Sequence, residues 1–97
     1  MRGHIYFARE GDREVIMNYL ADWKLKSDTE LFAQYNDAQV KGFYGAHQQA
    51  LYIISMHLTF EKRCGKSPIK ITDNTLIEFT SPILKIGNNW EYLPSQN

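Results

Sequence analysis

The fold is decided by the stretch Phe43–Arg63, which reads FYGAHQQALYIISMHLTFEKR. It is the longest run of helix-compatible sequence in the chain and also the most apolar one. Its apolar residues recur at helical spacing in two adjoining stripes, and Gly65 and Pro68 follow as stop signals. We therefore predict a central helix that begins between residues 44 and 46, ends near Cys64 and is covered on two sides. The two stripes are His47, Leu51, Ile54 and Leu58, and Phe43, Ala50, Ile53, His57 and Phe60.

Two amphipathic helices are predicted before this central one. The first is expected to run from Asp12, which can serve as its N-cap, to about Lys26, with two lysines near its C-terminus. The second is expected to start after Ser27, because Ser27 and Glu30 have the spacing of a capping box. Gly42 stands where a C-cap residue would end this second helix. Its predicted buried face consists of Leu31, Tyr35 and Ala38, with Phe32 beside them.

Strand-like sequence lies on both sides of the helices. His4–Ala8 has the composition of a short strand, and after Pro68 apolar residues alternate with polar ones in four short runs. Asp73-Asn74 and Gly87-Asn88-Asn89 can form turns between these runs, whereas Ser81–Lys85 fits either a strand or a helical turn. The chain therefore predicts an α+β fold: a short N-terminal strand, three helices with a buried third helix, and a C-terminal antiparallel β-meander or hairpin.

Size, charge and cysteine content limit the class of protein. A length of 97 residues suits one globular domain, residues 1–97. Eleven basic residues balance eleven acidic ones, so the chain has no overall field that attracts nucleic acid. A single cysteine is typical of a reducing compartment. The apolar run Ile5–Ala8 is too short for a signal peptide, and no window reaches the roughly 18 apolar residues of a membrane helix. We expect a cytoplasmic protein that does not span a membrane, and we assign no cofactor.

Three residues near the end of the central helix have the chemistry of a polar or metal-binding cluster: His57, Glu61 and Cys64. Their spacing places them along one helical face, and all three side-chain types ligate zinc. His57 and Cys64, however, are about 10 Å apart in helical rise, whereas zinc ligands lie about 2 Å from the ion. The interpretation we favour is a partly buried His57 bonded to Glu61, with Cys64 packed as a small apolar residue. We therefore predict no catalytic residue and no metal, and an enzyme that uses this cluster is the last alternative.

Two other polar patterns do not predict a small-molecule site. Gly65-Lys66-Ser67 resembles the end of a phosphate-binding loop, but Phe60 stands where such a loop requires its first glycine. His47 and His57 are ten residues apart, so on a helix their directions differ by about 80° and they cannot act on one substrate atom. His47 is more typical of a core histidine with a satisfied hydrogen bond than of a pH-responsive or ligand-facing group.

Positive charge gathers at the exit of the central helix. From Lys41 to Lys70 the chain has five basic residues and one acidic residue, a local net charge of +4. Three helices followed by a hairpin are also the order of a winged-helix nucleic-acid-binding domain, which is the alternative function. Two features count against this alternative. The early turns of the central helix are apolar on most sides, and the positive charge lies at its C-terminal end, whereas base contacts come mainly from N-terminal residues of a recognition helix.

Aromatic residues are the least ordinary feature of the composition. The chain has 13 of them, more than a domain of this size can fully bury, and exposed aromatic rings are typical of binding surfaces. Phe43 and Tyr44 lie between two glycines, where their rings can project. We expect a partner-binding surface made of Phe43, Tyr44, Lys62, Arg63 and Lys66. The leading hypothesis is a non-enzymatic, cytosolic protein-binding or regulatory module whose partner is another protein or a second copy in a homodimer.

Overall fold

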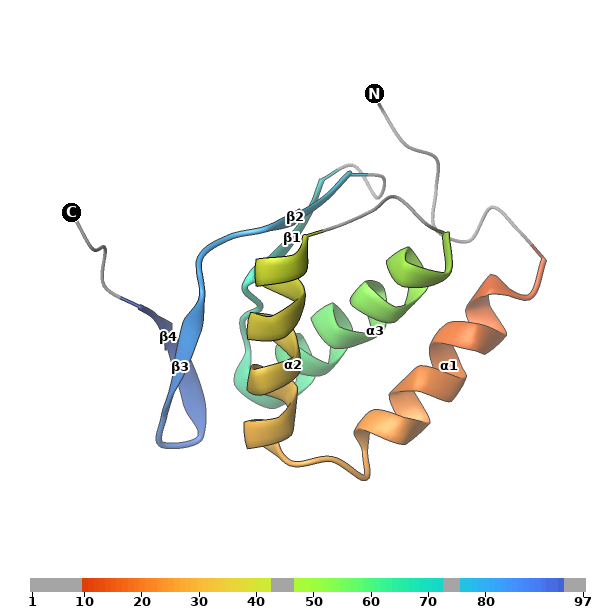
Figure 1. Ribbon diagram of the computed structural model, residues 1–97. Coiled ribbons are helices and arrows are strands. Elements are labelled where there is room, and N and C mark those ends of the chain that lie inside the picture. The colour runs from red at the N-terminus through yellow and green to blue at the C-terminus, as the bar shows by residue number, and fades with distance from the viewer. Residues whose placement is uncertain (1–9, 43–46, 73–75, 94–97) are drawn as a thin grey trace.

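Helices and strands are segregated along the chain in the computed structural model, which describes residues 10–42, 47–72 and 76–93 (Figure 1). Three helices come first and four short strands follow: α1 (Asp12–Trp23), α2 (Asp28–Lys41), α3 (His47–Cys64), β1 (Ile69–Thr72), β2 (Leu76–Phe79), β3 (Ile83–Ile86) and β4 (Asn89–Tyr92). This order confirms the predicted α+β class. The predicted N-terminal strand, His4–Ala8, and the Asp73-Asn74 turn lie outside the described residues.

α3 is the centre of the core, as its sequence predicts. Its buried residues are Leu51, Ile53, Ile54, Ser55, Met56, Thr59 and Phe60. α1 lies along one side of α3, whereas on the other side the Phe60 ring is stacked on Phe32 of α2 at 5.5 Å and meets Trp90 of β4 edge-on at 6.3 Å. Leu58 departs from the prediction, because it is 38% exposed instead of buried with its stripe. It projects into an open groove between α1 and α3.

Both ends of α1 differ from the expectation. The N-cap is Gly11, at a φ of 89° and with no side-chain cap hydrogen bond, and Asp12 is the first helical residue. The Asp12 carboxylate is buried and lies 2.8 Å from His47 Nε2, so α3 holds this carboxylate and it does not cap α1. α1 ends at Trp23, because the amide of Lys26 bonds to the Trp23 carbonyl three residues back in a tighter turn. The lysines expected in the last turn therefore lie beyond the helix.

α2 begins and ends where the sequence predicts. The Ser27 N–H donates to Glu30 Oε1 at 3.1 Å and the Glu30 N–H donates to Ser27 Oγ at 3.2 Å, which confirms the capping box. Gly42 follows the last turn at a φ of 81°, a conformation that side-chain-bearing residues rarely adopt. The predicted face is buried through Leu31 and Tyr35.

The described strands form two separate antiparallel hairpins, which agrees with the hairpin form of the prediction and not with a single continuous meander. β1 pairs with β2 and β3 pairs with β4, and among the described strands β2 and β3 belong to different sheets. The chain between them turns toward α2, where the Tyr35 hydroxyl donates to the Ser81 carbonyl at 3.0 Å. Pro82 has no N–H with which to continue a ladder. β3 starts at Ile83, so the ambiguous segment Ser81–Lys85 leads into a strand.

α2 also holds the second hairpin by its backbone. Asn36 Nδ2 donates to the Ile83 carbonyl at 2.8 Å, and the Ile83 N–H donates to Asn36 Oδ1 at 2.9 Å. Gln39 adds a bond to the carbonyl of Thr80 at 3.3 Å. The amide of Asn36 therefore satisfies backbone groups that a neighbouring strand would otherwise pair. A turn at Gly87, with a φ of 59°, joins β3 to β4 as predicted.

Candidate functional site

The polar cluster considered on α3 is only partly assembled. His57 Nε2 lies 3.5 Å from Glu61 Oε1, and His57 Nδ1 lies 2.9 Å from the hydroxyl of Ser67. Burial raises the pKa of the Cys64 thiol and the charge of Asp28 raises it further, which keeps the thiol protonated at neutral pH. In the part of the chain that the structure describes, no group of three His, Cys, Asp or Glu residues could hold a metal ion. These residues therefore provide neither an activated nucleophile nor a three-ligand metal site.

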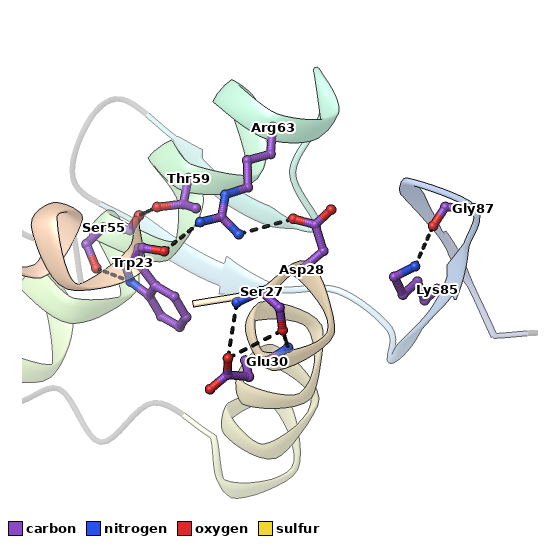
Figure 2. A network of polar contacts seen from close by, with 9 residues as sticks. All are labelled: Trp23, Ser27, Asp28, Glu30, Ser55, Thr59, Arg63, Lys85 and Gly87. Atoms are coloured by element: carbon purple, nitrogen blue, oxygen red, sulfur yellow. Dashed lines mark hydrogen bonds and ion pairs between the residues drawn. The ribbon is translucent and has the colours of Figure 1, made fainter. Parts of the chain in front are cut away.

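Arg63 connects the ends of three helices (Figure 2). From α3 its Nη1 donates to Asp28 Oδ1 at the start of α2, at 3.1 Å, and its Nη2 donates to the Trp23 carbonyl at the end of α1. The Trp23 indole N–H in turn donates to Ser55 of α3 at 3.0 Å. The guanidinium of Arg63 is thus committed to contacts within the chain, where it satisfies a helix C-terminal carbonyl.

Lys66 is also engaged within the chain. Its Nζ lies 4.6 Å from the centre of the Trp90 ring and 3.5 Å from Glu91 Oε2. The Trp90 indole N–H donates to the Lys66 carbonyl at 3.2 Å. These contacts attach β4 to the exit of α3, although the Lys66 side chain stays about half exposed.

Lys62 has a different place from its neighbours. It is exposed, and none of the ion pairs among the described residues includes it. Phe43 and Tyr44, the aromatic end of the predicted partner surface, lie outside the described residues. The structure therefore describes only the basic end of that surface, which consists of Lys62, Arg63 and Lys66. Of these three cations, Lys62 is the one that forms no ion pair with another described residue.

A groove lies between α1 and α3, and we call it the α1–α3 groove. Its main hollow has a volume of about 580 Å³ and is lined by Met17, Leu20, Ala21, Trp23, Lys24, Leu58, Thr59, Lys62 and Arg63. An adjoining hollow of about 450 Å³ extends it and is lined by Arg13, Ile16, Met17, Leu20 and Leu58. Met17, Leu20 and Leu58 line both hollows and form a continuous apolar floor. Met17 is 57% exposed and Leu58 is 38% exposed.

The α1–α3 groove follows from how the two helices pack. They lie side by side and run in the same direction (Figure 1). Their first turns meet where Asp12 contacts His47 at 2.8 Å, and further along the Tyr19 ring packs edge-on against Tyr52 at 5.1 Å. Met17 precedes Tyr19 by two residues, so it projects about 160° away from that contact on the helix. Contact on one face of α1 thus leaves its Met17 face open.

The sequence pattern does not predict the residues of this floor. Leu58 has the spacing of the buried stripe, and spacing alone does not tell whether a neighbouring helix covers it. Met17 carries a signal, because a flexible apolar side chain beside the main apolar face is typical of adaptable binding surfaces. The basic residue Lys62 is predicted as part of a partner surface and does line the groove.

Comparison with protein-family models, with curated proteins and with solved structures finds no match to this chain. Within the described residues, no helix has both the length and the apolar character needed to cross a membrane. The α1–α3 groove is the feature on which the functional proposal rests.

Proposed function

We propose that this chain is a non-enzymatic, cytosolic protein-binding module that takes its partner in the α1–α3 groove. The observation that carries the proposal is the continuous apolar floor, in which Met17 and Leu58 remain exposed on a folded domain. Covering apolar surface contributes about 25 cal/mol per Å², and contiguous exposed apolar surface is typical of interaction sites. A partner would supply the cover that α1 and α3 do not give each other.

The state of the most reactive side chains supports binding over catalysis. Both ring nitrogens of His57 have partners, Glu61 and Ser67. The raised pKa of Cys64 disfavours its thiolate, whereas nucleophilic catalysis needs a thiol whose pKa is lowered. One half-buried free cysteine also suits a reducing compartment.

The test is capture from the native cell with three forms of the full chain. They are the unchanged protein, Leu58→Glu in the groove, and Val40→Glu on α2, where the side chain is 80% exposed and lines neither hollow. We expect a protein that the unchanged chain and Val40→Glu retain and Leu58→Glu loses. Thermal melts establish that both variants are folded. Retention of the same proteins by all three forms would overturn the proposal.

Self-association is the second form of the same proposal, with a second copy as the partner. Light scattering after size-exclusion chromatography, over a range of concentrations, tests it. A dimer that Leu58→Glu converts to monomer would place the second copy in the groove. A strict monomer removes self-association and leaves the partner as another protein.

Nucleic-acid binding of the winged-helix type stays an alternative prediction, and the described contacts give it less support. Early polar residues of α3 are engaged, because Gln48 Nε2 donates to the Tyr19 hydroxyl at 2.6 Å and Gln49 Nε2 donates to the Gly42 carbonyl at 3.3 Å. A recognition helix needs such residues for base edges. Gel retardation at low salt with duplex and single-stranded probes tests this alternative, and the absence of any retarded species removes it.

A further inference from the structure

We infer that the segment bound in the α1–α3 groove is an amphipathic helix of the partner protein whose polar edges are acidic. This inference rests on the proposed function and specifies the chemistry of its ligand. Three observations carry it: the walls of the groove, the arrangement of its two hollows, and the sign of the charges around them.

Both walls of the groove are helices. α1 and α3 satisfy their backbone N–H and C=O groups internally, so these walls have no strand edge to which an extended peptide could add by main-chain hydrogen bonds. Recognition in such a groove depends on side chains, and the usual ligand of an apolar groove between helices is the apolar face of another helix. The walls therefore favour a helical ligand over an extended one.

The two hollows adjoin along one floor. Met17, Leu20 and Leu58 line both of them, so a ligand that fills one hollow lies next to the other. Apolar residues at i and i+4 of a helix are about 6 Å apart along its axis. Successive anchors of one apolar stripe would therefore enter the two hollows in turn, with the remaining faces of the ligand helix above the rims of the groove.

The rims are basic. Arg13 lines one hollow, and Lys24, Lys62 and Arg63 line the other, whereas none of the described lining residues is acidic. Arg63 is paired with Asp28, so Arg13, Lys24 and Lys62 are the cations whose charges remain for a ligand. In a chain with no net charge, this local excess of positive charge makes the groove favour a negatively charged partner.

Acidic residues on the same helices do not cancel this charge. Glu61 of α3 lies beside His57, at 3.5 Å. On α1, Asp22 follows Arg13 by nine positions, so at 100° per residue it projects from the opposite side, about 180° away. Glu14 is exposed but lines neither hollow. A ligand with carboxylates flanking its apolar stripe would therefore meet cations at the rims.

Two occupants from this chain fit less well. Residues 1–9 contain Arg2 and Arg9 and no carboxylate, so they carry the same positive charge as the rims and would be repelled by them. In a second copy, the outer face of α2 offers Val40 with Asp37, but the Asp37 carboxylate is already 3.1 Å from Lys41 Nζ. A separate acidic helix would both cover the apolar floor and pair with the cations at the rims.

The experiment begins with displayed helical peptides selected on the full-length protein. Peptides of about twenty residues are long enough to form helix. Apolar residues are fixed along one stripe, and the other positions vary freely among glutamate, lysine, glutamine and alanine. Counter-selection on Leu58→Glu removes peptides that bind elsewhere. We expect the enriched peptides to be net acidic, with glutamate at positions that flank the stripe.

The best peptide is then measured on purified protein variants. We expect Leu58→Glu to weaken binding by about tenfold or more, as for a central contact of an interface. Lys62→Glu changes a solvent-exposed charge at the rim and should weaken binding by a smaller factor, about severalfold. Lys70→Glu, which lines neither hollow, should leave affinity unchanged. Affinity should fall as salt rises, because the charges at the rims are exposed to solvent. The same peptide with lysine in place of each glutamate should not bind.

The two tryptophans give an internal reporter. Trp23 lines the groove and its indole N–H donates to Ser55, whereas the Trp90 indole N–H donates to Lys66 at the exit of α3. In amide-and-indole NMR spectra, the acidic peptide should shift the Trp23 indole signal and leave that of Trp90 in place. A shift of the Trp90 signal alone would mean that the peptide binds elsewhere, which overturns the inference.

The remaining outcomes separate the inference from the proposed function. Enriched peptides that are basic or uncharged, yet lost with Leu58→Glu, overturn the acidic ligand and leave the groove as a protein-binding site. A dimer that Leu58→Glu dissociates overturns the inference in favour of a second copy. Selection that yields no groove-dependent peptide overturns the helical ligand, and capture from the native cell with the same variant then decides the proposed function independently.

Discussion

On the side of α3 that faces α2 and β4, Phe60 is fully buried among aromatic rings, whereas two positions earlier Leu58 is 38% exposed beside Met17. The two residues are similar in hydrophobicity and belong to one helix. What differs is the cover: rings from two other elements close over Phe60, while α1 packs on α3 through the face that carries Tyr19 and leaves its Met17 face open. The same helix thus serves as core on one side and as the wall of a groove on the other.

The polar groups on the two sides differ in the same way. On the side that faces α2, side chains of α2 bond to the backbone of the segment that leads into β3. Asn36 bonds to both the N–H and the carbonyl of Ile83. Around the α1–α3 groove, Lys24 and Lys62 are exposed to water. Matched polar groups suit a permanent contact, and solvated cations suit a contact that forms and dissociates. The polar contacts on the side that faces α2 and β4 therefore suit a stable attachment, and the exposed cations around the groove suit the proposed binding of a partner.

The largest expected effect contrasts Phe60→Ala with Leu58→Ala. Phe60→Ala removes a fully buried ring and should lower the free energy of unfolding by about 3–5 kcal/mol. Leu58→Ala should cost about 1 kcal/mol or less, because much of its side chain is already in contact with water. Urea unfolding followed by circular dichroism measures both.

If Phe60→Ala does not fold, Phe60→Leu should still cost more than Leu58→Ala, at about 1–2 kcal/mol. Equal losses at positions 58 and 60 would show that both sides of α3 are closed, and the comparison would fail.

The next effect concerns Asn36. Asn36→Ala leaves the Ile83 N–H and C=O without their partners and should lower the free energy of unfolding by about 1–3 kcal/mol. Hydrogen exchange should show the loss of protection concentrated in β3 and β4, because the hairpin is held to α2 through this residue. Gln34→Ala, at an exposed position of the same helix, is the control and should have little effect. Protection lost uniformly across the chain would contradict a local attachment.

Arg63 and Lys62 sharpen the comparison at adjacent positions. Arg63→Met removes the bonds to Asp28 and to the Trp23 carbonyl and should cost about 1–2 kcal/mol of unfolding free energy. Lys62→Met should change the free energy of unfolding by no more than about 0.5 kcal/mol, since its ammonium takes part in none of the ion pairs between described residues. Thermal unfolding of both variants tests this, with peptide affinity as a second readout. An equal loss of stability in the two variants would remove the assignment of Lys62 to binding.

Local signals in the sequence account for much of the fold. The capping box of Ser27 and Glu30, the stop at Gly42 and the change of period after Pro68 each depend on nearby residues, and each appears in the structure. Two features depend on distant residues and were not predictable. Asp12 is held by His47, 35 positions away, and Asn36 bonds to Ile83, 47 positions away, which separates the hairpins. No local pattern marks either contact.

The candidate site was predictable only in part. Lys62 follows from the clustering of charge at the helix exit, and the contact between His57 and Glu61 follows from their spacing on one helical face. The exposure of Leu58 could not be predicted, because a helical stripe shows which residues share a face and not which element covers that face. Covering a stripe is a tertiary property, and it is the property that makes the α1–α3 groove.

The smallest expected effect is the dependence of stability on alkaline pH. It concerns the side of α3 that faces α2 and β4. Burial raises the pKa of Tyr35, whose hydroxyl donates to the Ser81 carbonyl, so the folded protein holds this proton more tightly than the unfolded chain does. The proton therefore adds nothing to the pH dependence of stability below about pH 9. The unfolded chain loses its phenolic proton at about pH 10, whereas Tyr35 in the folded protein keeps its proton to higher pH. As pH rises from the lower pKa to the higher one, deprotonation increasingly favours the unfolded chain, so the stabilisation from the Tyr35 proton is lost as pH passes through the pKa of the folded state.

Tyr35→Phe should lower the free energy of unfolding at neutral pH by about 1 kcal/mol, because a hydrogen bond is lost. The free energy of unfolding of this variant should also fall less steeply at alkaline pH, because the phenol that titrates is gone. Tyr52, whose pKa burial also raises, provides the matched control on the α1 side of α3. Tyr52→Phe should make the alkaline decline shallower without the loss at neutral pH, since its hydroxyl makes none of the side-chain hydrogen bonds described between residues 10 and 93. Urea unfolding at several pH values measures both variants. If Tyr52→Phe loses as much unfolding free energy at neutral pH as Tyr35→Phe does, the two sides of α3 do not differ in how their polar groups are hydrogen-bonded.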